Sequence, residues 1–212
     1  MEDTIITALN WRYATKQYDP TATLTDRELS TILESGRLAP SSFGVEAWKF
    51  IVVENKELRT KLRAAAWNQS PFTDASHLVI IARRTDVREN ITRELLQRTA
   101  ATRGIAEETL DGYKQMVEGT IAGRSDEALD AWVAKQAYIP LGIMVETAAL
   151  LNVDSTPMEG FDPKQVDEIL GLPAQHLAAT AVLALGHRAA DDAYAAYAKV
   201  RRPKEEVIAF VR

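Results

Sequence analysis

Three short apolar runs limit the choice of fold more than any other feature of the sequence. They are Trp48–Val53, Leu78–Ala82 and Thr180–Gly186. Runs of this length that are rich in aliphatic and β-branched residues are typical of buried β-strands. The stretches between them are long and rich in helix-forming residues, so strands and helices do not alternate regularly. This order favours an α+β fold over a doubly wound parallel sheet.

Helix boundaries are marked by local capping signals. Thr25 and Glu28 have the spacing of a capping box, and the helix that they begin is expected to end near Gly36. Asp162-Pro163 and Gly171 bracket a second helix with a cap, a first-turn proline and a terminal glycine. Met1–Arg12 has the apolar spacing of a short amphipathic helix.

The region between the second and third apolar runs is almost entirely helix-forming. Its longest helix is expected to begin at Ser125, and residues 86–124 form a helical excursion before it. Asn152–Asp162 is expected to contain a short strand and a turn. Val207–Val211 is expected to be a last strand, lying outside the compact unit. We therefore expect one domain over residues 1–212 with a sheet of four or five strands.

Composition excludes several classes of function. The chain has 212 residues, of which 46% are hydrophobic, so it can bury a sizeable core. It has no cysteine, which excludes disulfides and thiolate chemistry. The net charge of -5 and the absence of a basic stripe argue against nucleic-acid binding. No signal peptide or apolar run of membrane-spanning length is found, so a cytoplasmic protein without membrane contact is expected.

Common catalytic and metal-binding motifs are absent from the sequence. The three histidines are scattered without metal-ligand spacing, so no metal site is expected. No nucleophile elbow, P-loop or G-x-G-x-x-G fingerprint occurs, and no side chain is predicted to be catalytic. Four large side chains with loose helical spacing are interpreted as core or interface positions: Tyr113, Met116, Trp132 and Tyr138.

Two basic clusters and one turn form the candidate ligand site. Arg12–Lys16 and Lys199–Arg202 each combine guanidinium and ammonium groups, a pairing that suits a phosphate monoester. Pro157–Gly160 fixes a backbone turn that a planar ligand can approach closely. The simpler alternative for both basic clusters is solvated surface charge.

In these motifs the sequence resembles the nitroreductase family, with the closest likeness to the oxygen-insensitive NAD(P)H nitroreductases of bacteria. The resemblance covers nearly the whole chain, from about Ile5 to Pro203. It rests on these segments in order: Arg12–Lys16, Pro40-Ser41-Ser42, Trp48-x-Phe50, Asn68, Asp74-Ala75-Ser76-His77, Pro157–Asp162, Gly186-His187 and Lys199-x-Arg201.

The resemblance implies a mainly antiparallel sheet flanked by helices, in a homodimer with FMN at the subunit interface. The excursion 86–124 would cover the active site, and the tail 203–212 would pack on the partner subunit. Pro40–Ser42 would reach the flavin from the partner, and the backbone N–H of Glu159 would point at flavin N5. The implied cofactor-binding residues are Arg12, Tyr13, Ala14, Lys16, Pro40, Ser41, Ser42, Asn68, Gln136, Pro157, Met158, Glu159, Gly160, Lys199 and Arg201.

The implied activity is reduction of nitroaromatics, quinones or similar flat acceptors by NADH or NADPH. Hydride would pass through flavin N5 in a ping-pong cycle, with Phe43, Tyr113 and Met116 as candidate substrate contacts. Because the cofactor carries this chemistry, the lack of a recognisable catalytic side chain is expected. Two alternatives remain: a specialised reductase of the same fold acting on a small metabolite or dihydropteridine, and a flavin-binding dimer without turnover.

Overall fold

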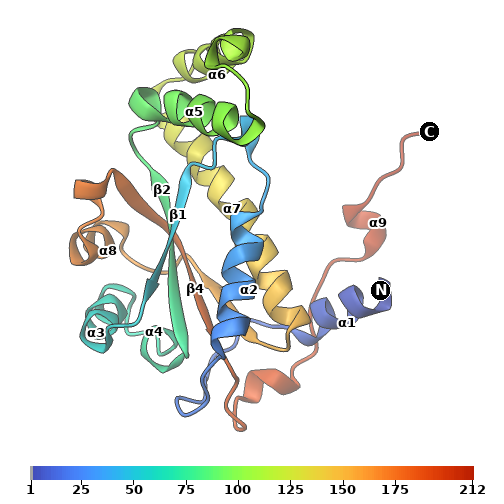
Figure 1. Cartoon of the computed structure of the whole chain (residues 1–212). Helices are drawn as coiled ribbons and strands as arrows, with labels where there is room; N and C mark the ends of the chain where they lie inside the picture. The colour runs from blue at the N-terminus through green and yellow to red at the C-terminus, as the bar shows by residue number, and fades with distance from the viewer. Residues whose placement is uncertain (1) are drawn as a thin grey trace.

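The computed structural model describes residues 2–212 and contains one antiparallel four-stranded sheet (Figure 1). Its strands are β1 (Trp48–Val53), β2 (His77–Arg84), β3 (Asp154–Met158) and β4 (Leu177–Gly186), arranged in the order β1-β2-β4-β3. Every neighbouring pair is antiparallel. The expected α+β class and the expected strand number are confirmed.

Helices cover both faces of this sheet. Successive residues of a strand point to opposite faces, so Leu78 and Ile80 of β2 lie in one core, whereas Val79 and Ile81 lie in the other. The first core is completed by α3 (Lys56–Ala65), α4 (Pro71–Asp74) and α8 (Pro163–Leu170). The second is completed by α2 (Asp26–Arg37) and α7 (Asp126–Leu150), as Figure 1 shows. With both faces covered, β2 and β4 are largely buried.

The capping signals in the sequence set the helix boundaries. Thr25 and Glu28 form the reciprocal capping box at the start of α2, which ends at Arg37. The Asp162 side chain accepts hydrogen bonds from the first turn of α8, and Gly171 ends that helix with a left-handed φ of 60°. The predicted boundaries of both helices are confirmed to within a residue.

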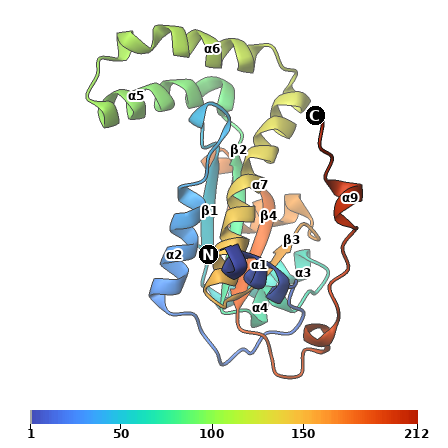
Figure 2. The ribbon, with the colours of Figure 1, turned by 90° about the vertical axis from the view of Figure 1, so that its right-hand side faces the viewer.

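Residues 87–122 form a helical arm that projects from the end of the sheet (Figures 1 and 2). The arm consists of the π-helical turn η2 (Val87–Ile91), α5 (Thr92–Arg103), the 3₁₀ turn η3 (Glu107–Leu110) and α6 (Asp111–Ala122). Its apolar side chains pack on the first turns of α7 and on the loop before β1. The arm is therefore anchored at its base to the N-terminal part of α7.

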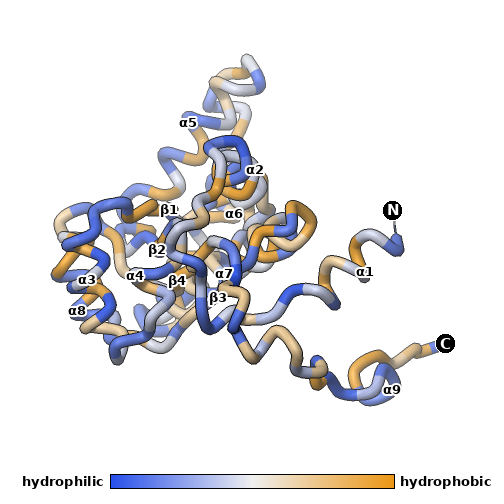
Figure 3. Tube along the Cα trace, turned by 90° about the horizontal axis from the view of Figure 1, so that it is seen from below, coloured by the Kyte–Doolittle hydropathy of each residue, from blue (hydrophilic) through white to orange (hydrophobic). Residues whose placement is uncertain are grey.

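Both ends of the chain project from the same side of the body (Figures 1 and 3). The N-terminal end is α1 (Glu2–Trp11), and the C-terminal segment contains η5 (Ala193–Ala196) and α9 (Lys204–Val207). The predicted strand Val207–Val211 is wrong, because α9 ends at Val207 and residues 208–212 have no regular structure. A strand needs a neighbour for its backbone hydrogen bonds, and no other strand of residues 2–212 lies beside this segment. The apolar side chain of Phe210 is 82% exposed.

Gly186 provides a test of how tightly β4 is packed. A Cβ added there would lie 2.7 Å from Cδ1 of Tyr18 and 3.0 Å from the backbone nitrogen of Ser76. Tyr18 cannot yield easily, because its hydroxyl is hydrogen-bonded to Thr156 and to the carbonyl of Ala184. We expect Gly186→Ala to lower the free energy of unfolding by about 1–3 kcal/mol in urea denaturation.

The matched control for Gly186→Ala is Gly119→Ala in α6, where an added Cβ meets nothing within 4 Å. This exposed helical site is expected to gain about 1 kcal/mol from the better helix propensity of alanine. Equal effects of the two substitutions would contradict the packing described at Gly186.

Candidate functional site

The first part of the site is the segment after α1, which runs beside the edge strand β3. Ala14 forms a parallel bridge with Ser155 of β3. The hydroxyl of Thr156 donates a 2.7 Å hydrogen bond to the carbonyl oxygen of Thr15, which is fully buried. The backbone of Arg12–Lys16 is thereby fixed against the sheet.

The C-terminal segment brings a second set of cations to the same place. The ammonium of Lys199 donates hydrogen bonds to the carbonyl oxygens of Leu9 (2.5 Å) and Arg12 at the end of α1. Burial and the nearby charge of Arg201 lower the pKa of Arg12. Burial and the charges of Arg12 and Arg201 lower the pKa of Lys199. Three cations from opposite ends of the sequence therefore lie close enough to repel one another.

This cationic cluster, consisting of Arg12, Lys199 and Arg201, has no carboxylate partner. Within residues 2–212, none of its members forms an ion pair. The Nε of Arg12 is buried and has no hydrogen-bond acceptor. A buried donor without an acceptor is costly and signals a missing ligand, water or ion. Excess positive charge and an open guanidinium donor fit a phosphate group.

Lys199 also has a structural role that the sequence did not indicate. Its two hydrogen bonds satisfy carbonyl groups at the C-terminus of α1, where a cation interacts favourably with the helix dipole. Two of its three ammonium donors are thus engaged by the protein, which leaves one for a ligand.

The guanidinium of Arg188 packs against two aromatic rings of the basic segment. The guanidinium carbon lies 4.3 Å from the ring centre of Trp11 and 4.6 Å from that of Tyr13. Its Nε donates a 2.8 Å hydrogen bond to Asp154, a carboxylate that is 3% exposed. The backbone N–H of Arg188 binds the other oxygen of Asp154 at 2.8 Å. The rings on either side of Arg12 are therefore held in place by a buried ion pair.

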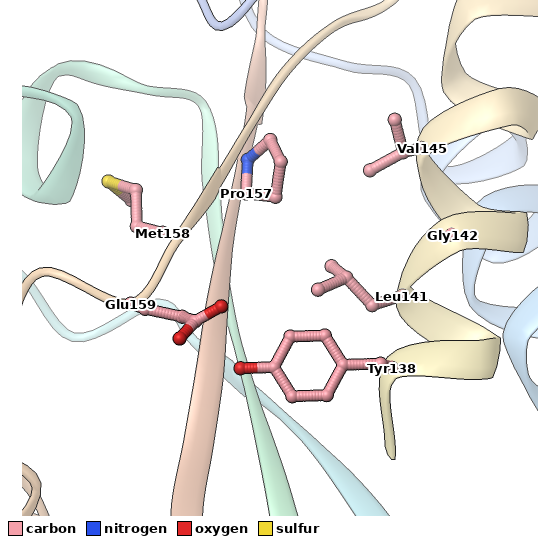
Figure 4. A pocket seen from close by; sticks show the side chains of 7 residues that line it. All are labelled: Tyr138, Leu141, Gly142, Val145, Pro157, Met158 and Glu159. Carbon is pink, nitrogen blue, oxygen red and sulfur yellow. The ribbon is translucent and has the colours of Figure 1, made fainter. Parts of the chain in front are cut away.

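The second part of the site is an apolar cavity of about 400 Å³ between α7 and the end of β3 (Figure 4). Its lining residues are Tyr138, Leu141, Gly142, Val145, Pro157, Met158 and Glu159. Ligand pockets of this kind combine an apolar lining with a few polar groups that orient the ligand. The predicted turn Pro157–Gly160 thus contributes to a cavity whose size suits a planar ring system.

Only two side chains of the cavity lining carry polar groups, Tyr138 and Glu159, and they face one another in Figure 4. Burial, followed by the neighbouring carboxylate of Glu159, raises the pKa of Tyr138 to about 12. The phenol is therefore neutral at physiological pH. Of the two interpretations of Tyr138, a core position is wrong, because the residue is 38% exposed and lines the cavity, whereas an interface position stays a prediction.

A strained loop connects the two parts of the site. Trp67 and Asn68 have left-handed φ values of 53° and 60°, a conformation that costs energy in residues other than glycine. The next residue, Gln69, donates a hydrogen bond of 2.5 Å to the carbonyl of Gly160. A Cβ on Gly160 would lie 2.9 Å from the ring of Trp67, so any other residue there would displace this ring. The hydroxyl of Ser70 donates to the carbonyl of Lys16 at 3.2 Å.

Pro40–Ser42 and Gln136 form a separate group in this chain. The backbone N–H of Ser42 donates a 2.8 Å hydrogen bond to Oε1 of Gln136, a buried side chain on α7. Among residues 2–212, no hydrogen bond joins this group to Arg12–Lys16. One chain therefore holds two groups of predicted cofactor residues that do not meet.

Two of the three candidate substrate residues line a second cavity, of about 720 Å³, which runs along α5 of the arm. Phe43 and Tyr113 both line this cavity, and the Tyr113 hydroxyl donates to the carbonyl of Phe43. Met116 lies on α6 with 57% of its surface exposed and is not among the residues that line this cavity. Two of the three predicted contacts are thus brought together.

No described helix is both long and apolar enough to cross a membrane. Over residues 2–212, no group of three or more His, Asp or Glu side chains is arranged to hold a metal ion.

The nitroreductase family profile matches residues 9–187 of the chain. The chain belongs to the nitroreductase family. A provisionally named NAD(P)H nitroreductase of Staphylococcus epidermidis is 37% identical, over 100% of this chain and 98% of the relative. A provisionally named NAD(P)H nitroreductase of Staphylococcus haemolyticus is 38% identical, over 100% of this chain and 99% of the relative.

Solved structures confirm the nitroreductase fold. A provisionally named nitroreductase of Bacillus subtilis superposes with a TM-score of 0.88 at 18% identity, over 100% of each chain. Another from Exiguobacterium sibiricum, solved in complex with FMN, gives a TM-score of 0.81 at 22% identity over 98% of this chain and 97% of its own.

The buried ion pair beneath the site gives a stability prediction. Arg188→Met leaves the carboxylate of Asp154 buried without a cation, at an expected cost of about 3 kcal/mol. Combining it with Asp154→Asn should cost less than the sum of the two single substitutions, as measured by urea unfolding.

The matched control for Arg188→Met is Arg37→Met, because the ion pair between Arg37 and Glu34 is exposed. Its loss is expected to leave the free energy of unfolding almost unchanged, because solvent screens an exposed ion pair. Additive effects of Asp154→Asn and Arg188→Met would show that the two charges are not coupled.

Proposed function

We propose that the chain is an FMN-dependent NAD(P)H oxidoreductase that reduces nitroaromatics, quinones or similar flat acceptors. Relatives that are 37% and 38% identical over nearly their whole length are named NAD(P)H nitroreductases, and a structure of the same fold was solved with FMN. The observation that carries the proposal is the cationic cluster, in which the Nε of Arg12 is buried and has no acceptor. This is the chemistry that the phosphate of FMN requires.

Each part of the site has a proposed role in holding the cofactor. Arg12, Lys199 and Arg201 neutralise the phosphate, and Lys16 adds a further cation, with Tyr13 and Ala14 alongside. Asn68 binds the polar edge of the flavin ring. The turn formed by Pro157, Met158, Glu159 and Gly160 would hold one face of the ring, and the Glu159 backbone N–H would be the donor for N5.

When bound, FMN supplies the redox chemistry by carrying a hydride from NADH or NADPH to the acceptor. The protein contributes orientation and exclusion of water at the apolar cavity walls. Tyr138 keeps its proton on Oη at neutral pH, so it can donate a hydrogen bond but does not act as a general base.

The site is proposed to be completed by a second copy of the chain. Pro40, Ser41 and Ser42 lie beside Gln136 and away from the cationic cluster, and so can serve the flavin of the partner subunit. Phe43, Tyr113 and Met116 are proposed to contact the acceptor at that same flavin of the partner subunit. The exposed apolar side chains of residues 203–212 suit packing on the partner.

The direct test is the visible spectrum of the purified protein, before and after NADH or NADPH is added without oxygen. We expect flavin absorbance, present on purification or after reconstitution with FMN, that bleaches with a nicotinamide nucleotide. Turnover on nitrofurazone, menadione and a dihydropteridine then separates broad acceptor reduction from a specialised reductase. A colourless protein after reconstitution would refute the FMN assignment, and flavin that stays oxidised would indicate a non-catalytic dimer.

Arg12→Ala tests the phosphate site. Removing a charge-assisted hydrogen bond worth about 1.5–3 kcal/mol should weaken FMN binding by roughly tenfold or more. Because the Nε of Arg12 is buried without an acceptor, the protein without FMN should not lose stability. Flavin fluorescence titration measures the first effect and thermal unfolding the second.

The matched control for Arg12→Ala is Arg202→Ala, because Arg202 is exposed and forms no ion pair within residues 2–212. Its FMN affinity should equal that of the unmodified protein. Equal losses for the two variants would mean that only overall charge attracts the ligand, and not a site at Arg12.

A further inference from the structure

We infer that Asp192 is the positioning residue that assembles the phosphate-binding end of the site, by fixing the backbone of Lys16 and the ring beneath its ammonium group. Asp192 is not one of the predicted cofactor-binding residues. As an anion it would itself repel a phosphate. The inference rests on the proposed FMN site and assigns a role to a residue that does not touch the cofactor.

Asp192 is a buried carboxylate, 4% exposed, whose partners come from the other end of the sequence. Its Oδ2 accepts hydrogen bonds from the backbone N–H groups of Lys16 (3.0 Å) and Gln17 (3.3 Å). The same oxygen accepts a 2.8 Å hydrogen bond from the hydroxyl of Tyr13. One side chain thus binds the segment on both sides of Thr15. Its partners are separated from it by 175 to 179 positions in the sequence.

The other carboxylate oxygen, Oδ1, organises the C-terminal side. It accepts a hydrogen bond of 3.1 Å from the backbone N–H of Tyr194 and caps η5. The ring of Tyr194 lies 5.7 Å from Nζ of Lys16, a distance at which a cation and an aromatic ring attract. Asp192 therefore fixes both the backbone of Lys16 and the ring beneath its ammonium group.

Both carboxylate oxygens of Asp192 accept hydrogen bonds from donors of the protein, so the carboxylate is used internally. Burial alone would raise the pKa of Asp192, but the hydrogen bonds from Lys16, Tyr13, Gln17 and Tyr194 more than offset it and lower the pKa. Within residues 2–212, Asp192 forms no ion pair with a cation. The cationic cluster consequently keeps its charge for a ligand.

Positioning and simple charge predict effects of opposite sign. If Asp192 acted only through its charge, its neutralisation would raise the positive potential and tighten phosphate binding. If Asp192 positions Lys16 and Tyr13, then Asp192→Asn replaces one acceptor oxygen by an amide NH₂ group. This donor would face N–H donors of the protein, with which it cannot form a hydrogen bond. The segment then shifts and phosphate binding weakens.

The test compares Asp192→Asn, Asp192→Ala and Asp191→Asn with the unmodified full chain. Asp191 is the neighbouring carboxylate; it is exposed and controls for the loss of one charge. For each protein the dissociation constants of FMN and riboflavin are measured by flavin fluorescence, with the thermal unfolding temperature of the flavin-free protein. Riboflavin lacks the phosphate, so the ratio of the two constants isolates the phosphate site.

We expect both Asp192 variants to lose roughly tenfold or more in FMN affinity. Their affinity for riboflavin should stay within a factor of about two to three of the unmodified protein, and so should both flavin affinities of Asp191→Asn. A general structural effect would lower the unfolding temperature and weaken both flavins equally, which overturns the inference. Unchanged or tighter FMN binding in Asp192→Asn also overturns it. Should the unmodified chain bind neither flavin, the proposed function fails first, so the two failures are distinguishable.

Discussion

The pairing of β3 with β4 is the constraint on which the rest of the site depends. It sets Asp154 opposite Gly186, so the chain leaving β4 passes directly beside the start of β3. Arg188 can then reach Asp154, and Ala14 can bridge to Ser155 on the free edge of β3. This one edge of the sheet positions three segments: Arg12–Lys16, Pro157–Gly160 and the chain that follows Gly186.

The site combines two kinds of environment that usually conflict in one protein. Burial and the closeness of other positive charges lower the pKa of Arg12 and Lys199, and this repulsion destabilises the chain without a ligand. The cavity between α7 and β3 is lined mainly by apolar side chains. Strain in the loop at Trp67 and Asn68 lies between them. Such costs are typical of binding sites, where complementarity to a ligand is favoured over stability of the empty protein.

Local signals in the sequence predicted the fold well. The caps at Thr25 and Asp162 and the apolar runs depend on neighbours a few residues away, so they can be recognised in sequence. The terminal strand Val207–Val211 was wrongly predicted because its run of β-branched and aromatic residues shows only a propensity, whereas a strand also needs a partner for its backbone. The core interpretation of Tyr138 failed for a related reason, since helical spacing alone does not tell which face of a helix lines a cavity.

For the site, sequence could identify the charged residues but not the groups that organise them. Arg12 and Lys199 stand out because basic residues cluster around them. Asp154, Arg188 and Asp192 act on partners more than thirty residues away, and for Asp192 more than 170, so no local pattern marks them. The match to the family profile ends at residue 187, one residue before Arg188, whose guanidinium packs against Trp11 and Tyr13.

The hydrogen bonds from Lys199 to the end of α1 have a consequence for how the protein is made. They join parts of the chain separated by 187 and 190 positions, which are among the last contacts that a growing polypeptide can form. Domains fold as their residues leave the ribosome, from the N-terminus onward. The sheet and its covering helices can form while synthesis continues, but the contacts between Lys199 and the end of α1 cannot form until Lys199 has emerged. A ligand that needs both Arg12 and Lys199 can therefore bind only after synthesis has passed Lys199.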